Sequence, residues 1–228
     1  MPPEAVRVGV VDSGFSEHQK VALSAAFILR NHQLWLEESQ PDQLGHGSQI
    51  IEIINMLAPD SEVISAQVFG DRYTTSAPQV GAAIDWLVDQ GAQVINLSLG
   101  LRSDSESLRK SCERAITRGT ILCASSPARG DPVFPSAYPG IFRMTGDARC
   151  GRHEISCLNS RFADFGACVR PISEAIGSSG ASVGCAHLTA HVALYMQNAE
   201  KTGFSDVQEW LAQEARYHGP ERRGVVHE

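Results

Sequence analysis

The sequence predicts an α/β fold in which a mostly parallel β-sheet is covered by helices on both faces. Segments rich in β-branched residues alternate along the chain with segments whose apolar residues recur at helical spacing. Glycines and prolines mark the boundaries between these segments, so the connections are short. No internal repeat, low-complexity segment or linker interrupts the pattern, and 228 residues are enough for one sizeable core. We therefore expect a single domain over residues 1–228.

The first strand is expected at residues 6–14, where "VRVGVVDSG" is rich in β-branched residues and ends in an Asp-Ser-Gly turn. A helix is expected at residues 45–59, because glycines precede an apolar helical pattern that Pro59 stops. The later strands are apolar runs that end at turn residues, at positions 61–69, 93–100, 120–126 and 140–147. The later helices have helical apolar spacing, at positions 77–92, 105–119 and 204–216. A further helix is expected within residues 178–193, a stretch that is first rich in glycine and serine and then apolar with helical spacing. In such a sheet, functional groups collect at the carboxyl ends of the strands.

The composition excludes several classes of partner. The net charge is −7 and the basic clusters are short, so neither a nucleic acid nor an anionic membrane surface is an expected partner. The N-terminal segment lacks the pattern of a secretory signal, and no run approaches the roughly 18 apolar residues of a membrane span. We therefore expect a cytosolic protein, and no pro-segment is visible ahead of the first strand.

The cysteines of this chain are expected to be reduced thiols. They are scattered without CxxC pairs, and in a chain without an export signal they are expected to be buried and unpaired; they are Cys112, Cys123, Cys150, Cys157, Cys168 and Cys185. A zinc site is the alternative, but no Cys or His pair has the spacing of zinc ligands. No clustered acidic loop demands calcium either. We expect neither a metal nor an organic cofactor.

A carboxylate, an imidazole and a hydroxyl occur where strands or loops meet glycines. Asp12 closes the first predicted strand, His46 opens a helix within "GHGS", and Ser182 opens another within "GASVG". These are the parts of a nucleophilic triad, in which histidine takes the serine proton and the carboxylate orients the histidine. Each residue also has a structural interpretation: a turn aspartate, a core histidine and a helix N-cap. Their joint occurrence on glycine-flanked loops favours catalysis.

The residues around this set resemble the subtilisin-like serine proteases (subtilases). "VGVVDSG" resembles the aspartate motif of that family, "GHGSQI" its histidine motif and "GASVGCAH" its serine motif. "VINLSLG" and "YPGIFRMTG" resemble intervening family segments, and the resemblance extends from about residue 6 to residue 200. It implies a subtilisin-like three-layer fold with one catalytic domain. It also implies that an extended protein or peptide substrate lies along Ser98, Leu99 and Gly100.

The chain departs from the family pattern around the oxyanion site. Alignment without gaps over Gly119–Gly130 puts Ala128 where the family has an asparagine, and alanine has no side-chain donor. Losing one such donor typically lowers the rate by about 10²–10³. The oxyanion would then depend on the backbone N–H of Ser182 and an unidentified second donor. The nearby candidates are Ser125, Ser126 and Arg129.

Further departures lie beside the nucleophile and in the specificity pocket. Ala181 and Ala186 replace the usual threonine and proline of the serine motif. The segment after Ala128 is shorter than in typical secreted members of the family. By this resemblance the floor of the specificity pocket lies near Val133, which suggests cleavage after a small or apolar residue. His187 matches a family histidine that is expected to be structural, and His191 is expected to pack in the core.

The expected function is a serine endopeptidase in which Asp12 orients His46, His46 acts as general base and then general acid, and Ser182 attacks the scissile carbonyl. A weakened oxyanion hole and a narrow pocket suggest a selective processing protease that removes a leader from one dedicated partner. One such role is leader removal from the small cross-linked subunit of quinohemoprotein amine dehydrogenase. The alternatives are a catalytically impaired subtilase fold that binds peptides, and an unrelated α/β protein with coincidental motifs.

Overall fold

The computed structural model describes residues 5–172 and 180–221. Within that part of the chain, one ten-stranded sheet has the order β10-β8-β9-β7-β6-β5-β1-β4-β2-β3. Its strands are β1 (Arg7–Asp12), β2 (Leu23–Arg30), β3 (Gln33–Glu37), β4 (Glu62–Gln67), β5 (Val94–Leu97), β6 (Ile121–Ser125), β7 (Phe142–Gly146), β8 (Ile155–Cys157), β9 (Phe165–Ala167) and β10 (Tyr217–His218). Only the β2–β3 and β8–β9 pairs are antiparallel. The sheet is therefore mostly parallel, as predicted.

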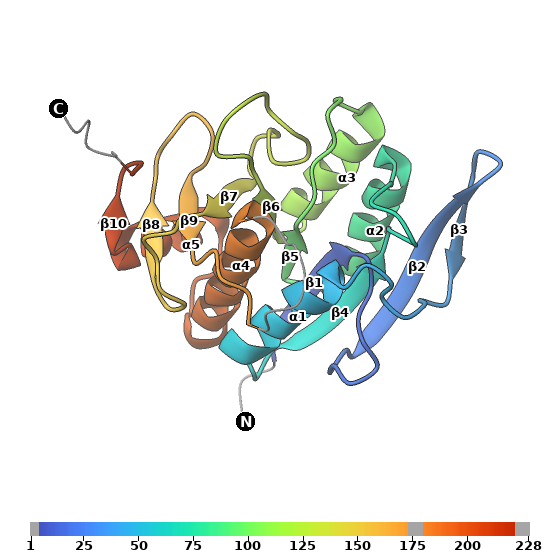
Figure 1. The fold of residues 1–228 in the computed structure, drawn as a ribbon, viewed down its shortest axis with the longest axis horizontal. Helices are drawn as coiled ribbons and strands as arrows, with labels where there is room; N and C mark the ends of the chain where they lie inside the picture. The colour runs from blue at the N-terminus through green and yellow to red at the C-terminus, as the bar shows by residue number, and fades with distance from the viewer. Residues whose placement is uncertain (1–4, 173–179, 222–228) are drawn as a thin grey trace, which may run out of the picture.

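Helices lie on both faces of this sheet (Figure 1). They are α1 (His46–Leu57), α2 (Ala77–Asp89), α3 (Glu106–Thr117), α4 (Gly180–Asn198) and α5 (Phe204–Glu214). One core contains the buried residues of α1, α4 and α5, and a second contains those of α2 and α3. Alternate strand residues face the two cores: Val10 of β1 belongs to the first, and Val11 belongs to the second. This is the three-layer arrangement that the sequence predicts.

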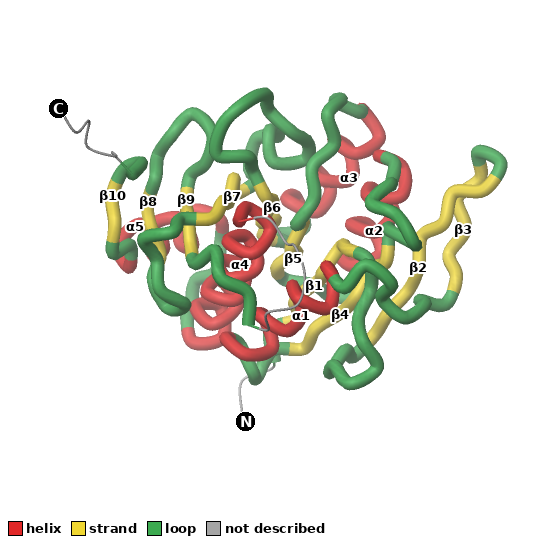
Figure 2. Tube along the Cα trace, in the orientation of Figure 1, coloured by secondary structure: helices red, strands yellow, loops and turns green. Residues whose placement is uncertain are grey.

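The central elements coincide with their predicted ranges, whereas five strands were not predicted. These are the β2–β3 hairpin and the short strands β8, β9 and β10, which extend the sheet at its two ends (Figure 2). One detail of the prediction is wrong. Ser182 does not cap its helix, because α4 begins at Gly180 and Ser182 is its third residue. The start of the predicted 178–193 segment, residues 178 and 179, lies outside the described residues.

The cysteines are unpaired and buried, as predicted. Among the described residues, no group of three or more His, Cys, Asp or Glu side chains is arranged to hold a metal ion. Across residues 5–172 and 180–221, no helix has the length and apolar character needed to cross a membrane.

Candidate active site

Asp12 and His46 are in direct contact at the carboxyl end of β1. The Nδ1 atom of His46 lies 2.7 Å and 2.9 Å from the two carboxylate oxygens of Asp12. Asp12 is buried and His46 is 11% exposed, so little water screens this pair. Burial alone lowers the pKa of His46, but the charge and hydrogen bond of Asp12, together with the charge of Asp42, raise it above its usual value. With Nδ1 turned to Asp12, the Nε2 atom is left to act as a base.

The loop after β1 holds the start of α1 against Asp12. Ser13 donates to Asp12 Oδ1 through its backbone N–H at 2.8 Å, and its hydroxyl accepts the N–H of Gly47 at 2.8 Å. A Cβ atom on Gly47 would lie 2.3 Å from the carbonyl oxygen of Gly14, so only glycine allows this approach. Asp42 accepts the N–H of Ser48 at 2.8 Å and thereby caps the first turn. These contacts fix His46, which opens α1.

Ser182 lies in the first turn of α4 and is hydrogen-bonded to the segment after β5. Its hydroxyl donates to the carbonyl oxygen of Ser98 at 3.2 Å, and the Ser98 hydroxyl donates to the carbonyl oxygen of Ser182 at 3.1 Å. The hydrogen bonds of the described residues include none between His46 and Ser182. Proton transfer from Ser182 to His46 would require the Ser182 hydroxyl to turn away from Ser98.

His46 and Ser182 nevertheless line the same cavity, which has a volume of about 460 Å³. Its other lining residues come from the segments after β4 and β5: Phe69, Tyr73, Thr74, Thr75, Ser98, Leu99, Gly100 and Leu101. The expected substrate-binding residues 98–100 thus form one wall of this cavity, and the loop that carries Tyr73 also lines it. The Tyr73 ring meets the His46 ring edge-on, with 6.0 Å between centroids and an angle of 88°. No sequence motif had indicated Tyr73.

Val133 lies against the wall formed by residues 98–100. A Cβ atom on Gly100 would be 2.8 Å from Cγ2 of Val133, so the valine directly covers this glycine. The next residues pair in both directions: the N–H of Leu101 donates to the carbonyl oxygen of Phe134 at 2.7 Å, and the reverse bond is 2.9 Å long. The short loop predicted from the sequence therefore fixes an apolar side chain beside residues 98–100.

Ala128 lines a different cavity, of about 900 Å³, at the carboxyl ends of β7 and β9. The two cavities share no lining residue, although each touches the start of α4: Ser98 of the first contacts Ser182, and Gly146 of the second packs against the Gly180 carbonyl. Arg129 is exposed and lines the same cavity as Ala128.

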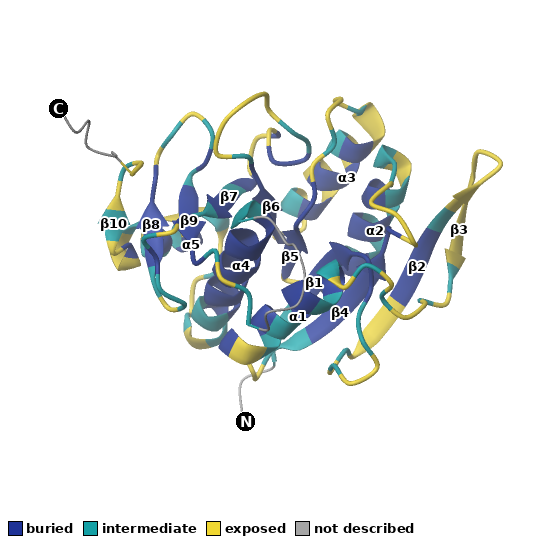
Figure 3. Cartoon of the chain, in the orientation of Figure 1, coloured by how far each residue is buried: buried dark blue, intermediate teal, exposed yellow. Residues whose placement is uncertain are grey.

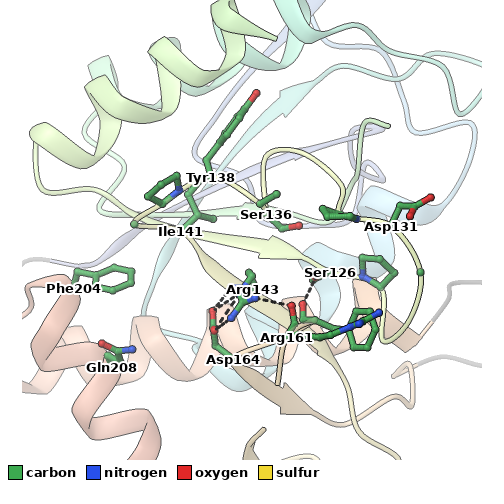
Figure 4. A pocket seen from close by; sticks show the side chains of 17 residues that line it. Ser126, Asp131, Ser136, Tyr138, Ile141, Arg143, Arg161, Asp164, Phe204 and Gln208 are labelled. Carbon is green, nitrogen blue, oxygen red and sulfur yellow. Dashed lines mark hydrogen bonds and ion pairs between the residues drawn. The ribbon is translucent and has the colours of Figure 1, made fainter. Parts of the chain in front are cut away.

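The two serines proposed as oxyanion donors have their hydroxyls engaged elsewhere. Ser125 donates to the carbonyl oxygen of Leu99 at 3.3 Å, and Ser126 donates to that of Phe162 at 2.6 Å. Figure 4 shows the Ser126 bond beside a third cavity, of about 690 Å³, where Arg143 is bound to Asp164. Because each hydroxyl has one proton, neither serine has a donor to spare in this arrangement.

The two histidines of α4, His187 and His191, do not line the cavity that contains His46 and Ser182. His187 is fully buried, and its Nδ1 atom lies 2.9 Å from the carbonyl oxygen of Val183. Burial lowers the pKa of His187, and it lowers the pKa of His191 to about 4. Both side chains are therefore neutral near pH 7, which fits packing and not proton transfer.

Comparisons with known proteins give one consistent result. The sequence model of the subtilase family matches residues 4–129. The thermostable alkaline protease of Halalkalibacterium halodurans is 25% identical over an aligned length of 243 residues, gaps included; the alignment covers 97% of this chain and 66% of that protein. Subtilisin Savinase of Lederbergia lenta is 26% identical over 209 residues, covering 82% of this chain and 73% of that protein.

The fold is shared with a solved protease from Pseudoalteromonas arctica PAMC 21717, at a TM-score of 0.71 and 16% identity. That match covers 94% of this chain and 87% of the solved one. The chain spans only 23% to 66% of the length of several curated relatives.

Proposed function

Because this chain belongs to the subtilase family, we propose that it is a serine endopeptidase whose catalytic triad is Asp12, His46 and Ser182. One observation carries the proposal: His46, held by Asp12 through Nδ1, opens onto the same cavity as Ser182. The carboxylate stabilises the Nδ1–H tautomer, so Nε2 can accept the serine proton. As a substrate carbonyl enters, Ser182 turns from Ser98 towards His46 and attacks. His46 then protonates the leaving amine, and water releases the acyl group through the same base.

The oxyanion site rests first on the backbone N–H of Ser182. In the first turn of α4, N–H groups are not bonded within the helix and carry its positive dipole end, so they favour a developing negative charge. Ala128 supplies no side-chain donor, and the hydroxyls of Ser125 and Ser126 are occupied. We therefore expect slow turnover on unselected peptides.

The substrate is a polypeptide in extended conformation that lies along Ser98, Leu99 and Gly100. Main-chain pairing with this wall would position the scissile bond beside Ser182. Val133 covers Gly100, which favours a small or apolar residue on the acyl side of the bond. Low intrinsic activity and a restricted pocket suit a processing protease that removes a leader from one dedicated protein or peptide.

We place this activity in the cytosol, because the six cysteines are unpaired thiols and such thiols persist in a reducing compartment. Fractionation of cells that contain the untagged protein checks this part of the proposal. Recovery of the mature protein only outside the cytosol would contradict it.

Labelling with a fluorophosphonate tests the catalytic proposal directly. The reagent should form one adduct, which peptide mapping by mass spectrometry assigns to Ser182. Ser182→Ala should abolish the adduct, whereas Ser126→Ala, which removes a hydroxyl outside the triad, should retain it. A folded protein that stays unlabelled at Ser182, with a leader-bearing substrate present, would overturn the endopeptidase proposal. Peptide binding by that inert protein would instead support the peptide-binding alternative.

The processing role is tested by comparing substrates. The leader-bearing small cross-linked subunit of quinohemoprotein amine dehydrogenase is one candidate, and an unstructured protein such as casein is the unselected control. We expect a single cut at the leader boundary and a kcat/KM at least tenfold above that for casein. Equal rates, or many cuts in both proteins, would leave an endopeptidase without the proposed selectivity.

A further inference from the structure

One edge of the sheet is formed by β3, the outer strand of the β2–β3 hairpin. The hairpin projects beyond the body of the molecule, and no described segment lies alongside β3 (Figure 1). Its turn consists of Asn31 and His32, whose φ angles of 51° and 61° are those of a type I′ turn. Four of the five residues of β3 are exposed, which Figure 3 shows along the strand.

The hairpin carries most of the large hydrophobic side chains that are exposed in the described part of the chain. Among the described residues, five of the seven large hydrophobic side chains that are exposed belong to the hairpin: Leu23 (42%), Leu29 (40%), Leu34 (40%), Trp35 (49%) and Leu36 (60%). Soluble proteins normally protect an edge strand with charges, prolines or a covering segment. The only charges of β2 and β3 are those of Arg30 and Glu37, which form an ion pair with each other at 2.5 Å. This edge is therefore apolar and electrically neutral.

The four leucines share one face of the hairpin. The register sets Leu29 opposite Leu34 and Phe27 opposite Leu36, so all of these side chains point to the same side. Phe27 is buried there against Trp86 of α2, with ring centroids 6.0 Å apart. The leucines therefore extend the same apolar face beyond the part that α2 covers, and there they are exposed. Trp35 points to the opposite side, together with its partner Ile28.

The backbone of β3 is ready for a further antiparallel strand. In a two-residue hairpin, the pair that flanks the turn exchanges both hydrogen bonds, and bonded and non-bonded pairs then alternate. Gln33, Trp35 and Glu37 thus bond to β2. Leu34 and Leu36, in non-bonded pairs, direct their N–H and C=O groups away from the sheet.

We propose that a second copy of this chain covers the edge, with the two β3 strands antiparallel about a two-fold axis at Trp35. The strand reads almost the same in both directions from that residue, as Gln-Leu-Trp-Leu-Glu. In this register Leu34 of each copy is opposite Leu36 of the other, and their outward N–H and C=O groups bond reciprocally. Gln33 then meets Glu37, an amide against a carboxylate, and no like charges face each other.

The two-fold axis lies perpendicular to the sheet, so the leucine faces of both copies join on one side and the two Trp35 rings meet on the other. The dimer would have one continuous sheet. β2 and β4 separate this edge from β1 and Asp12, so the catalytic residues are not part of the contact. The inference is thus independent of the proposed protease activity.

Sedimentation equilibrium of the full chain over a wide concentration range tests the proposal. We expect the wild-type protein to approach twice the chain mass as its concentration rises. Leu36→Pro removes an outward N–H without touching the bonds to β2, and Leu36→Lys sets a charge against the partner leucine. Each change should raise the dissociation constant of the dimer at least tenfold. Met56→Lys, a similar change at an exposed site outside the hairpin, should leave the dimer intact.

The fluorescence of Trp35, identified by comparison with Trp35→Phe, should shift to shorter wavelength as the dimer forms. Leu36→Lys keeps the test valid if the proline variant does not fold. A protein that stays monomeric at the highest concentration would overturn the proposal. A dimer that survives both Leu36 substitutions would overturn it equally, because its interface would lie elsewhere.

Discussion

At the scale of single residues, the pH dependence of the proposed activity depends on Asp12. His46 must be neutral to act as a base, so activity is lost as pH falls through its pKa. Burial of the imidazole lowers that pKa, but the charge and hydrogen bond of Asp12, together with the charge of Asp42, raise it overall. Without the carboxylate the burial remains, and the pKa must fall.

We therefore predict two effects of Asp12→Asn. The fluorophosphonate labelling rate at its plateau should fall by about 10⁴, because the amide no longer selects the productive tautomer. The acid limb of the pH–rate profile should move to lower pH. Asp42→Asn is the comparison variant: it removes the charge with the smaller effect on the pKa of His46, so its acid limb should move less. Its plateau should fall far less than that of Asp12→Asn, because Asp42 holds the first turn of α1 and does not hydrogen-bond to the imidazole. An acid limb that stays fixed in Asp12→Asn would show that another group controls it.

The sequence locates Asp12, His46 and Ser182 because each lies at a strand or helix boundary marked by glycines. It does not locate Tyr73, whose ring reaches His46 across a loop that carries no motif. Nor does it show that the Ser182 hydroxyl bonds to Ser98, since that contact joins residues far apart in the sequence. Local patterns therefore indicate the candidate reacting groups, whereas their neighbours depend on tertiary contacts.

At the scale of elements, the close packing of α4 on β7 controls the position of Ser182. A Cβ atom on Gly184 would lie 2.2 Å from the carbonyl oxygen of Thr145, well inside contact distance. Gly184→Ala must therefore push the start of α4 away from the sheet. We predict a loss of about 1–3 kcal/mol in the free energy of unfolding, and labelling of Ser182 at least tenfold slower.

Gly70→Ala is the matched control for this change. No atom lies within 4 Å of the Cβ position at Gly70, and its φ angle is outside the left-handed region. The Gly70→Ala variant should have the same free energy of unfolding and the same labelling rate at Ser182 as the wild-type protein. Denaturant titration measures stability, and timed labelling measures the reaction. If Gly184→Ala labels at the wild-type rate, the position of Ser182 does not depend on this contact.

Four of the five strands that the sequence did not predict are either very short or exposed. β8 and β9 have three residues each and β10 has two, which is too short for an apolar alternation to be recognised. In β3 the apolar residues are consecutive and exposed, so no buried face imposes a period of two. The long buried strands β1 and β4 were predicted because both of their faces are covered and each contains adjacent β-branched residues.

At the scale of the whole molecule, one sheet gathers the candidate catalytic groups from β1, α1 and α4. α4 also contacts β5, β6, β7 and β9, so the helix that carries Ser182 runs through the first core. The stability of that core and the position of the proposed nucleophile are therefore linked. Two histidines within α4 make the link sensitive to acid.

His191 is buried, and its pKa in the folded protein is about 4, against 6.5 for an exposed histidine. The neighbouring His187 and His153 lower the pKa of His191 further, because a positive charge on either ring opposes its protonation. Between pH 6.5 and pH 4 the unfolded chain binds a proton at residue 191 that the folded chain does not. The stability due to neutral His191 is thus complete above about pH 6.5 and is lost as pH falls towards 4.

We predict that His191→Gln reduces the acid loss of stability by about 3 kcal/mol between pH 6.5 and pH 4, the linkage value of a shift of this size. Denaturant unfolding at a series of pH values measures the difference between variant and wild type, which cancels the titration of the carboxylates. His18→Gln removes an exposed histidine and should retain the wild-type acid loss. Parallel pH curves for His191→Gln and the wild-type protein would mean that His191 is not held neutral in the core. The acid sensitivity of α4 would then have to come from His187, whose pKa is also lowered by burial.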